Sequence, residues 1–232
     1  PARAIRVAAA NDRHKCVEEL FKAANSISDK KMKNELIENL LLTKSSSGTP
    51  DFAIINAAEY GNNECIESLI NAASYIDDDE IKMRVIENML FAKHEGKYSN
   101  DTIFYAAKFG KSKSIAILIS CVKETFNHAE SDRIISQMLT FGDRNPLLIA
   151  TKCRHSECVV ELIRSANSIV DQKLRDKVII DMLSAGDLYG KNSAFRISVK
   201  LALNDRRFEN IVLALINLAL EITDDKARNQ LI

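Results

Sequence analysis

The chain has 232 residues, of which 46% are hydrophobic and 28% are charged, and it contains only seven glycines and three prolines. This composition is typical of a folded, largely helical protein and argues against disorder over most of its length. The 32 basic residues balance the 32 acidic ones, so no broad field of one sign is present to hold nucleic acid or an anionic membrane surface.

Two further signals are missing from the sequence. No apolar run approaches the roughly 18 residues that a membrane-spanning helix needs. The first ten residues, PARAIRVAAA, contain no hydrophobic segment of the secretory type. We therefore expect no membrane and no nucleic acid among the partners, and we expect any targeting signal to lie outside this chain.

Five copies of one apolar segment follow one another along the chain. The first copy, Cys-Val-Glu-Glu-Leu-Phe at residues 16–21, returns as Cys-Ile-Glu-Ser-Leu-Ile at residues 65–70, and later copies begin at Ser114, Cys158 and Ile211. The steps of 49, 49, 44 and 53 residues predict a single array of similar units, each packed on its neighbours. The units span about residues 3–50, 51–100, 101–144, 145–191 and 192–232.

Each unit is expected to begin with a pair of helices. In the second unit a short helix carries Ala57-Ala58, and a second helix presents the apolar residues of 65–70. Paired alanines allow close approach of neighbouring helices, and the turn between the two helices suits a residue with positive φ. The turn position is occupied in the first four units by Asp12, Gly61, Gly110 and Arg154.

A third helix follows in each unit, and an N-cap residue marks its start. The side chain of such a residue accepts a hydrogen bond from the first turn of the helix. The five candidate caps are Asp29, Asp78, Asn127, Asp171 and Asp224. One apolar face recurs behind them, as in Met32, Leu36, Ile37, Leu40 and Leu41. We interpret the acidic run 77–80 as a solvated helix start, not as a cation site.

The remaining segments are loops and an incomplete last unit. Turn-rich segments at 45–50, 94–100, 142–146 and 186–192 join the units and are expected to project along one edge. The last unit has a longer first helix, residues 193–205, without an alanine pair. The chain stops midway through the last third helix, and we expect it to be a fragment of a longer protein.

The cysteines and histidines predict no reactive site. Cys16, Cys65 and Cys158 share one register, where other copies carry Ser114 and Ile211; this exchange indicates a small buried slot and a reducing compartment, not a disulfide framework. The cluster 153–158 offers neither four converging zinc ligands nor an orienting group for a nucleophile. No phosphate-binding loop is present. The sequence predicts no metal, no cofactor and no enzyme activity.

The helix pairs resemble ankyrin repeats, whose pattern is Thr-Pro-Leu-His-x-Ala-Ala-x-x-Gly-His-x-x-Val-Val-x-x-Leu-Leu. The best matches are residues 52–61 with 65–70, and Asn145-Pro146-Leu147-Leu148-Ile149-Ala150 with 155–163. The resemblance covers about half of each unit. The units are longer than the ankyrin repeat of about 33 residues, and they add a third helix. The expected fold is an all-α, right-handed helical solenoid; a three-helix stack of the armadillo or HEAT type is the alternative.

The resemblance implies a scaffold that binds another protein through its concave face and the loops between repeats. The residues around the alanine pair would meet the partner: Asn56, Glu59, Tyr60, Tyr105, Lys108, Phe109, Ile149, Lys152 and Cys153. Tyr60 and Phe109 share one repeat position, where they either form a hot-spot stripe or, for Phe109, cover a junction between units.

Expectations about the wider setting follow from the same resemblance. Ankyrin-like arrays are typical of cytoplasmic proteins and also occur in effectors that bacteria deliver into the host cytoplasm. We expect a monomer in the cytoplasm. The alternative function is a regulatory or substrate-positioning module of a larger enzyme, and a catalytic motif beyond residue 232 would favour it.

Overall fold

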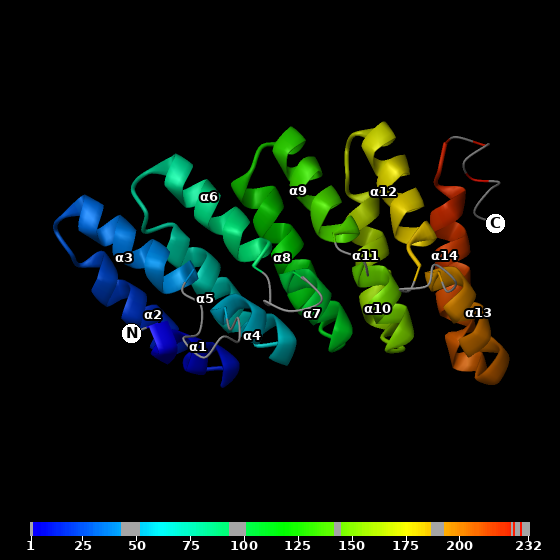
Figure 1. The fold of residues 1–232 in the computed structure, drawn as a ribbon, viewed down its shortest axis with the longest axis horizontal. Helices are drawn as coiled ribbons and strands as arrows, with labels where there is room; N and C mark the ends of the chain where they lie inside the picture. Colours follow the sequence, from blue (N-terminus) through cyan, green and yellow to red (C-terminus); the bar gives the residue numbers. More distant parts are fainter. Residues whose placement is uncertain are drawn as a thin grey trace. The chain divides into compact units, whose positions relative to one another are not determined.

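A computed structural model describes residues 2–42, 52–92, 101–141, 145–186 and 193–223, together with Asp225 and Arg228. Over these residues the chain forms fourteen α-helices and one short 3₁₀ helix, and no strand is found among them (Figure 1). The all-helical prediction is confirmed. The contacts divide the chain into two compact units, Pro1–Thr102 and Ile103–Ile232. In the structure, "unit" therefore means one of these two parts, and the helices of one sequence repeat are called a layer.

The first unit contains two layers of three helices. The first layer consists of α1 (Ala2–Ala10), α2 (His14–Asn25) and α3 (Lys30–Leu42), and the second of α4 (Ala53–Tyr60), α5 (Asn63–Ala73) and α6 (Asp79–Leu90). Helix α1 packs on α4, α2 on α5 and α3 on α6. Each helix therefore contacts its own counterpart in the sequence repeat.

The second unit continues the same scheme over α7–α14. Its helices are α7 (Thr102–Lys108), α8 (Ser112–Thr125), α9 (His128–Thr140), α10 (Pro146–Lys152), α11 (Ser156–Asn167), α12 (Gln172–Ser184), α13 (Ala194–Asn204), η1 (Arg206–Phe208) and α14 (Glu209–Leu220). Helix α8 packs on α11, α9 on α12, α10 on α13 and α11 on α14. Counterpart helices again lie against one another.

The turn between the first two helices of a layer adopts a left-handed backbone, as predicted. The φ angles are 53° at Asp12, 76° at Gly61, 74° at Gly110 and 65° at Arg154. Glycine reaches this region without strain, whereas a residue with a Cβ atom does so at a cost. In the last layer α13 continues past this position, and η1 forms the connection instead.

The predicted caps of the third helices are confirmed where the structure describes them. The side-chain oxygens of Asp29, Asp78, Asn127 and Asp171 accept hydrogen bonds from the backbone three residues ahead, at 2.9, 3.0, 3.0 and 2.9 Å. Asp224 lies outside the described residues, as do most residues of the predicted loops. These bonds satisfy first-turn N–H groups that have no partner within the helix.

Three of the five residues on the apolar face of α3 are buried. Ile37, Leu40 and Leu41 are at most 8% exposed, whereas Met32 is 60% exposed. Leu36, at the second position of this face, is half-buried. Met32 lies in the first turn of α3, and the buried stripe begins only one turn later.

A polar side chain on the third helix holds the next layer in three cases. Asp132 on α9 accepts hydrogen bonds from the backbone N–H groups of Val170 (3.0 Å) and Asp171 (2.9 Å). At the equivalent positions, Asn34 and Asp176 accept from the backbone N–H groups of Asp77 (3.2 Å) and Thr223 (3.1 Å). In these three cases the polar side chain holds the segment that precedes the next third helix.

Candidate functional site

Three of the residues predicted to bind a partner lie together at the end of α7. The ammonium group of Lys108 lies 5.0 Å from the ring centroid of Phe109 and 5.8 Å from that of Tyr105. Phe109 is 39% exposed, and Lys108 is exposed as well. A cation at this distance from an aromatic ring is attracted to the face of the ring. The three side chains therefore form one amphipathic surface.

The turn after α10 extends this surface. His155 Nε2 lies 3.1 Å from the backbone oxygen of Lys108, which places the turn beside the end of α7. Burial raises the pKa of the Cys153 thiol, and the positive charges of Lys108 and Lys152 oppose that rise, so both lysines act on this thiol. Arg154 lies over the ring of Phe208, at 5.6 Å from its centroid.

We call this surface of the second unit the basic-aromatic surface. It consists of Tyr105, Lys108, Phe109, Lys152, Arg154 and Phe208. Sequence reasoning found four of these residues and missed Arg154 and Phe208. Arg154 was assigned only to the turn, and Phe208 lies outside the repeat pattern, so neither carried a local signal of exposure on this surface.

The predicted binding residues of the first unit differ in exposure. Asn56 on α4 is only 9% exposed and offers little surface to a partner. Glu59 is half-buried, whereas Tyr60 is 57% exposed. Ile149, in the second unit, is half-buried. Among these residues, Tyr60 alone presents a large exposed ring.

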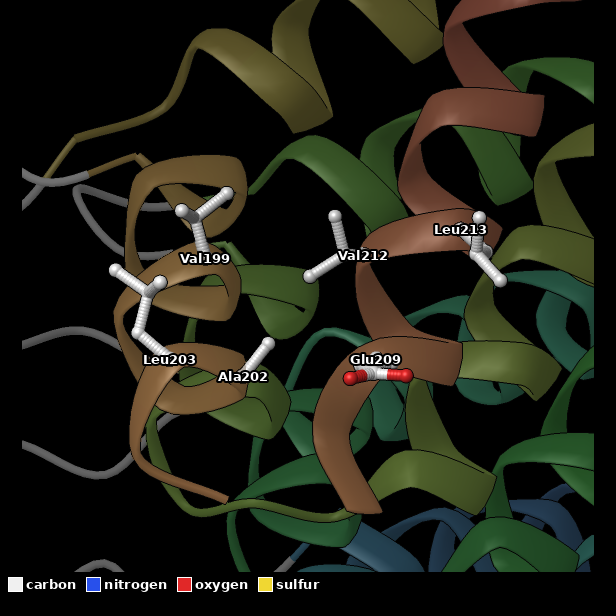
Figure 2. A pocket seen from close by; sticks show the side chains of 6 residues that line it. All are labelled: Val199, Ala202, Leu203, Glu209, Val212 and Leu213. Atoms are coloured by element: carbon white, nitrogen blue, oxygen red, sulfur yellow. The ribbon is translucent and has the colours of Figure 1, made fainter. Parts of the chain in front are cut away.

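A second surface feature is an apolar groove between α13 and α14. Its volume is about 360 Å³, and three residues from each helix line it (Figure 2): Val199, Ala202, Leu203, Glu209, Val212 and Leu213. Leu203 is 82% exposed and Leu213 is 57% exposed. Exposed apolar side chains that gather in one place are typical of surfaces that bind another molecule.

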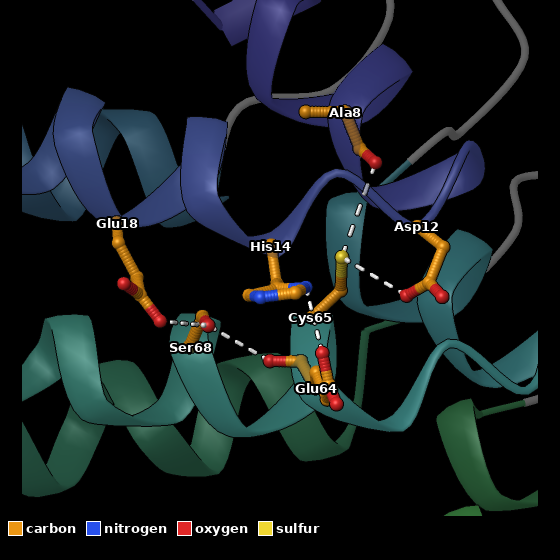
Figure 3. A network of polar contacts seen from close by, with 7 residues as sticks. All are labelled: Ala8, Asp12, His14, Glu18, Glu64, Cys65 and Ser68. Atoms are coloured by element: carbon orange, nitrogen blue, oxygen red, sulfur yellow. Dashed lines mark hydrogen bonds and ion pairs between the residues drawn. The ribbon is translucent and has the colours of Figure 1, made fainter.

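Polar groups join the two layers of the first unit (Figure 3). His14 Nδ1 lies 2.8 Å from a carboxylate oxygen of Glu64, and the Ser68 hydroxyl donates to Glu18 at 3.3 Å. The short distance alone defines the contact between His14 and Glu64 as an ion pair, because the buried Nδ1 atom of His14 makes no hydrogen bond of good geometry. Cys65 Sγ lies 3.9 Å from the backbone oxygen of Ala8. These contacts join α5 to both α1 and α2.

The buried thiols are held in the protonated form. Burial raises the pKa of Cys65 to about 11, and the nearby carboxylate of Asp12 adds to the rise. Burial likewise raises the pKa of Cys121 to about 11 and that of Cys158 to about 12. A thiol must lose its proton to act as a nucleophile. These three cysteines are therefore unreactive near neutral pH.

The predicted small slot is buried in every copy except the first. Cys65, Ser114 and Cys158 are 0% exposed and Ile211 is 2% exposed, whereas Cys16 is exposed. The slot faces the preceding layer, as the contact from Cys65 to Ala8 shows. No layer precedes α1 among the described residues, so the prediction of a buried Cys16 was wrong. All five cysteines are free thiols.

This difference in exposure predicts which thiols react. In dilute folded protein at pH 8, we expect Cys16 to react first with a disulfide reagent and half-buried Cys153 more slowly. Cys65, Cys121 and Cys158 should react only after denaturation. The measurement is the rate of thiol release, and Cys16→Ser should remove the fast phase. Reaction of Cys158 as fast as Cys16 would contradict the burial of the slot.

Among the described residues, no group of three or more His, Cys, Asp or Glu side chains is arranged to hold a metal ion. Over the same part of the chain, every helix is too short or too polar to cross a membrane. In comparisons with known proteins, no protein-family model matches this chain, and no curated protein matches it significantly.

Proposed function

We propose that this chain is a helical repeat protein of the solenoid type that binds another protein through the first helices of its repeats. Three observations support a repeat: counterpart helices pack on one another within each unit, four turns share a left-handed residue, and four third helices share an N-cap. The ankyrin-like pattern of the helix pairs supports the same proposal.

The basic-aromatic surface is the observation that carries the binding proposal. Tyr, Phe and Arg side chains are enriched where proteins meet. The aromatic rings contribute a large apolar area, and the Tyr hydroxyl and the Arg guanidinium add a polar or charged group. Lys108 and Arg154 lie over aromatic rings that remain partly exposed. A partner segment with carboxylates beside apolar side chains would satisfy both kinds of group. The balanced charge of the whole chain favours such a local contact over a polyanion.

The cysteines support a reducing compartment such as the cytoplasm. All five are free thiols, and Cys16 is exposed. Disulfides form and persist mainly in oxidising compartments. We propose a cytoplasmic location on this ground.

A photo-crosslinking experiment tests the binding proposal. A photoreactive phenylalanine analogue at Phe109 should capture a specific protein in a lysate of the source cells. The same analogue at Val170, which is 70% exposed in the same unit, should capture none.

Affinity measurements with the captured protein complete the test. Lys108→Ala together with Phe109→Ala should weaken its binding at least about tenfold, as loss of an interface hot spot does. Val170→Ala should leave binding unchanged. Equal capture at both positions, or equal affinity of both variants, would show that the partner does not bind here.

A further inference from the structure

Three turn segments of the second unit form one continuous edge. They are residues 105–113 at the end of α7, residues 149–157 at the end of α10, and residues 204–209, which include η1. The contact of His155 with the backbone oxygen of Lys108 joins the first segment to the second. The contact of Arg154 with the ring of Phe208 joins the second segment to the third. The basic-aromatic surface therefore extends across three successive layers.

These three segments are basic, although the chain as a whole is neutral. Their basic residues are Lys108, Lys111, Lys113, Lys152, Arg154, Arg206 and Arg207, and their acidic residues are Glu157, Asp205 and Glu209. The equivalent segments of the first unit, residues 7–15 and 56–64, contain two basic and three acidic residues. The repeat therefore does not require cations at this edge, and their excess is specific to the second unit.

Each of the three layers offers an accessible cation at this edge. Lys108 and Arg154 are exposed, and the side chain of Arg206 is 94% exposed. Arg206 lies 4.0 Å from Glu209, but an exposed ion pair of this kind is weak, so the guanidinium stays available to a partner. The exposed ring of Phe109 lies beside Lys108. The edge thus presents cations in series, with apolar rings next to them.

The distance between layers sets the spacing of a matching partner. Packed helices lie roughly 8–10 Å apart, so cations in successive layers recur at about that interval. A polyproline II segment repeats its side-chain direction every third residue, after a rise of about 9 Å. A β-strand repeats its face after about 7 Å, which is too short. An α-helix repeats its face after seven residues, at roughly 10.5 Å. It would have to order about fifteen residues to reach three layers, whereas the extended segment orders about seven.

We propose that the basic-aromatic surface binds a protein segment in the polyproline II conformation with an acidic residue at every third position. This inference rests on the proposed function and names the chemistry of the partner. Successive carboxylates pair with Lys108, Arg154 and Arg206, one in each layer. The apolar residues between them cover the rings of Phe109 and Phe208, as aromatic side chains do for other polyproline II ligands. The balanced charge of the whole chain disfavours a nucleic-acid strand.

Fluorescence anisotropy with a labelled synthetic peptide tests the proposal on the full chain. The probe consists of three Glu-Pro-Leu repeats with blocked termini, and each proline favours an extended backbone at the glutamate before it. The control peptide, Glu-Glu-Glu-Pro-Leu-Pro-Leu-Pro-Leu, has the same composition and charge but a different spacing. We expect the probe to bind at least about fivefold more tightly than the control peptide. Added salt should weaken its binding.

Charge reversal identifies the layers that the segment crosses. Lys108→Glu and Arg206→Glu should each weaken binding of the probe roughly three- to tenfold. Because these two cations lie in the outer layers of the edge, lysine in place of the glutamate at one end of the probe should restore binding to Lys108→Glu. Lysine at the other end should restore binding to Arg206→Glu. Lys173→Glu, at an exposed lysine of α12, makes the same charge change and should leave binding unchanged. Circular dichroism establishes that the variants are folded.

Several outcomes would overturn the proposal. No binding of the probe, or equal binding of the probe and the control peptide, would exclude the spacing. Rescue of both variants by lysine at the same end would show that the segment does not cross the layers. Tighter binding of single-stranded oligothymidine, or of a peptide with glutamates seven residues apart, would identify a nucleic acid or a helical partner instead. If the photoreactive analogue at Phe109 captures a protein through a segment without this spacing, the proposed function stands and the present inference fails.

Discussion

Replacing Asp132 with alanine is expected to lower the free energy of unfolding by about 2–3 kcal/mol. The carboxylate is 6% exposed and accepts from the backbone N–H groups of Val170 and Asp171, at 3.0 and 2.9 Å. Hydrogen bonds to a charged group contribute more than neutral ones. Alanine would leave both N–H groups without this acceptor and would release the segment before α12 from α9.

Two variants sharpen this prediction. Asp132→Asn keeps one acceptor oxygen and should lose only about 1 kcal/mol. Asp181→Ala, at an exposed aspartate of α12, should change stability by less than about 0.5 kcal/mol. Urea denaturation followed by circular dichroism measures all three. If Asp132→Ala unfolds at the same urea concentration as Asp181→Ala, the carboxylate does not hold the layers together.

The pKa of Asp176, at the same position in the next layer, is lowered. Asp176 is 8% exposed, and burial alone would raise its pKa. Hydrogen bonds from Thr223 and Gln172, with the nearby charge of Arg175, outweigh burial and lower the pKa overall. Because the folded pKa is lowered, the contribution of Asp176 to stability is present above the ordinary aspartate pKa and is lost on acidification below it.

Features that depend on nearby residues were predictable from the sequence. The caps at Asp29 and Asp171 act on N–H groups three residues ahead, and the left-handed turn at Gly61 needs only a residue that tolerates positive φ. The helical secondary structure and the order of the helices follow from apolar periodicity within one repeat. These signals recur in four of the five copies, and their agreement made them recognisable in the sequence.

Features that depend on the neighbouring layer were not predictable. Cys16 has the register of Cys158, yet only Cys158 is covered, because burial depends on whether another layer packs there. In the sequence, Asp132 resembles an exposed charged residue on a helix. Only the structure shows that the backbone of Val170 lies beside it and donates a hydrogen bond to it. The pairing of Arg154 with Phe208 joins residues 54 positions apart in the sequence and follows no repeat.

Gly110→Ala is expected to destabilise the protein by about 2 kcal/mol, because two penalties combine at this turn. The φ of 74° at Gly110 is left-handed, and an L-residue there costs roughly 1–2 kcal/mol. A Cβ atom would also lie 2.8 Å from Nδ1 of His155, closer than such atoms approach. The imidazole would have to move away from the backbone oxygen of Lys108, which it now contacts at 3.1 Å.

Comparison variants separate the two penalties. Gly61→Ala, at a φ of 76°, should cost about 1 kcal/mol from the backbone, whereas Arg154→Gly relieves a strained φ and should stabilise by up to about 1 kcal/mol. In the background of His155→Ala, the cost of Gly110→Ala should fall toward that of Gly61→Ala, because the ring that meets the Cβ atom is gone. Urea denaturation measures each difference. If Gly110→Ala lowers the free energy of unfolding by the same amount in that background, His155 does not restrict the residue at this turn. The end of α7, with Lys108 and Phe109, would then be positioned by other contacts.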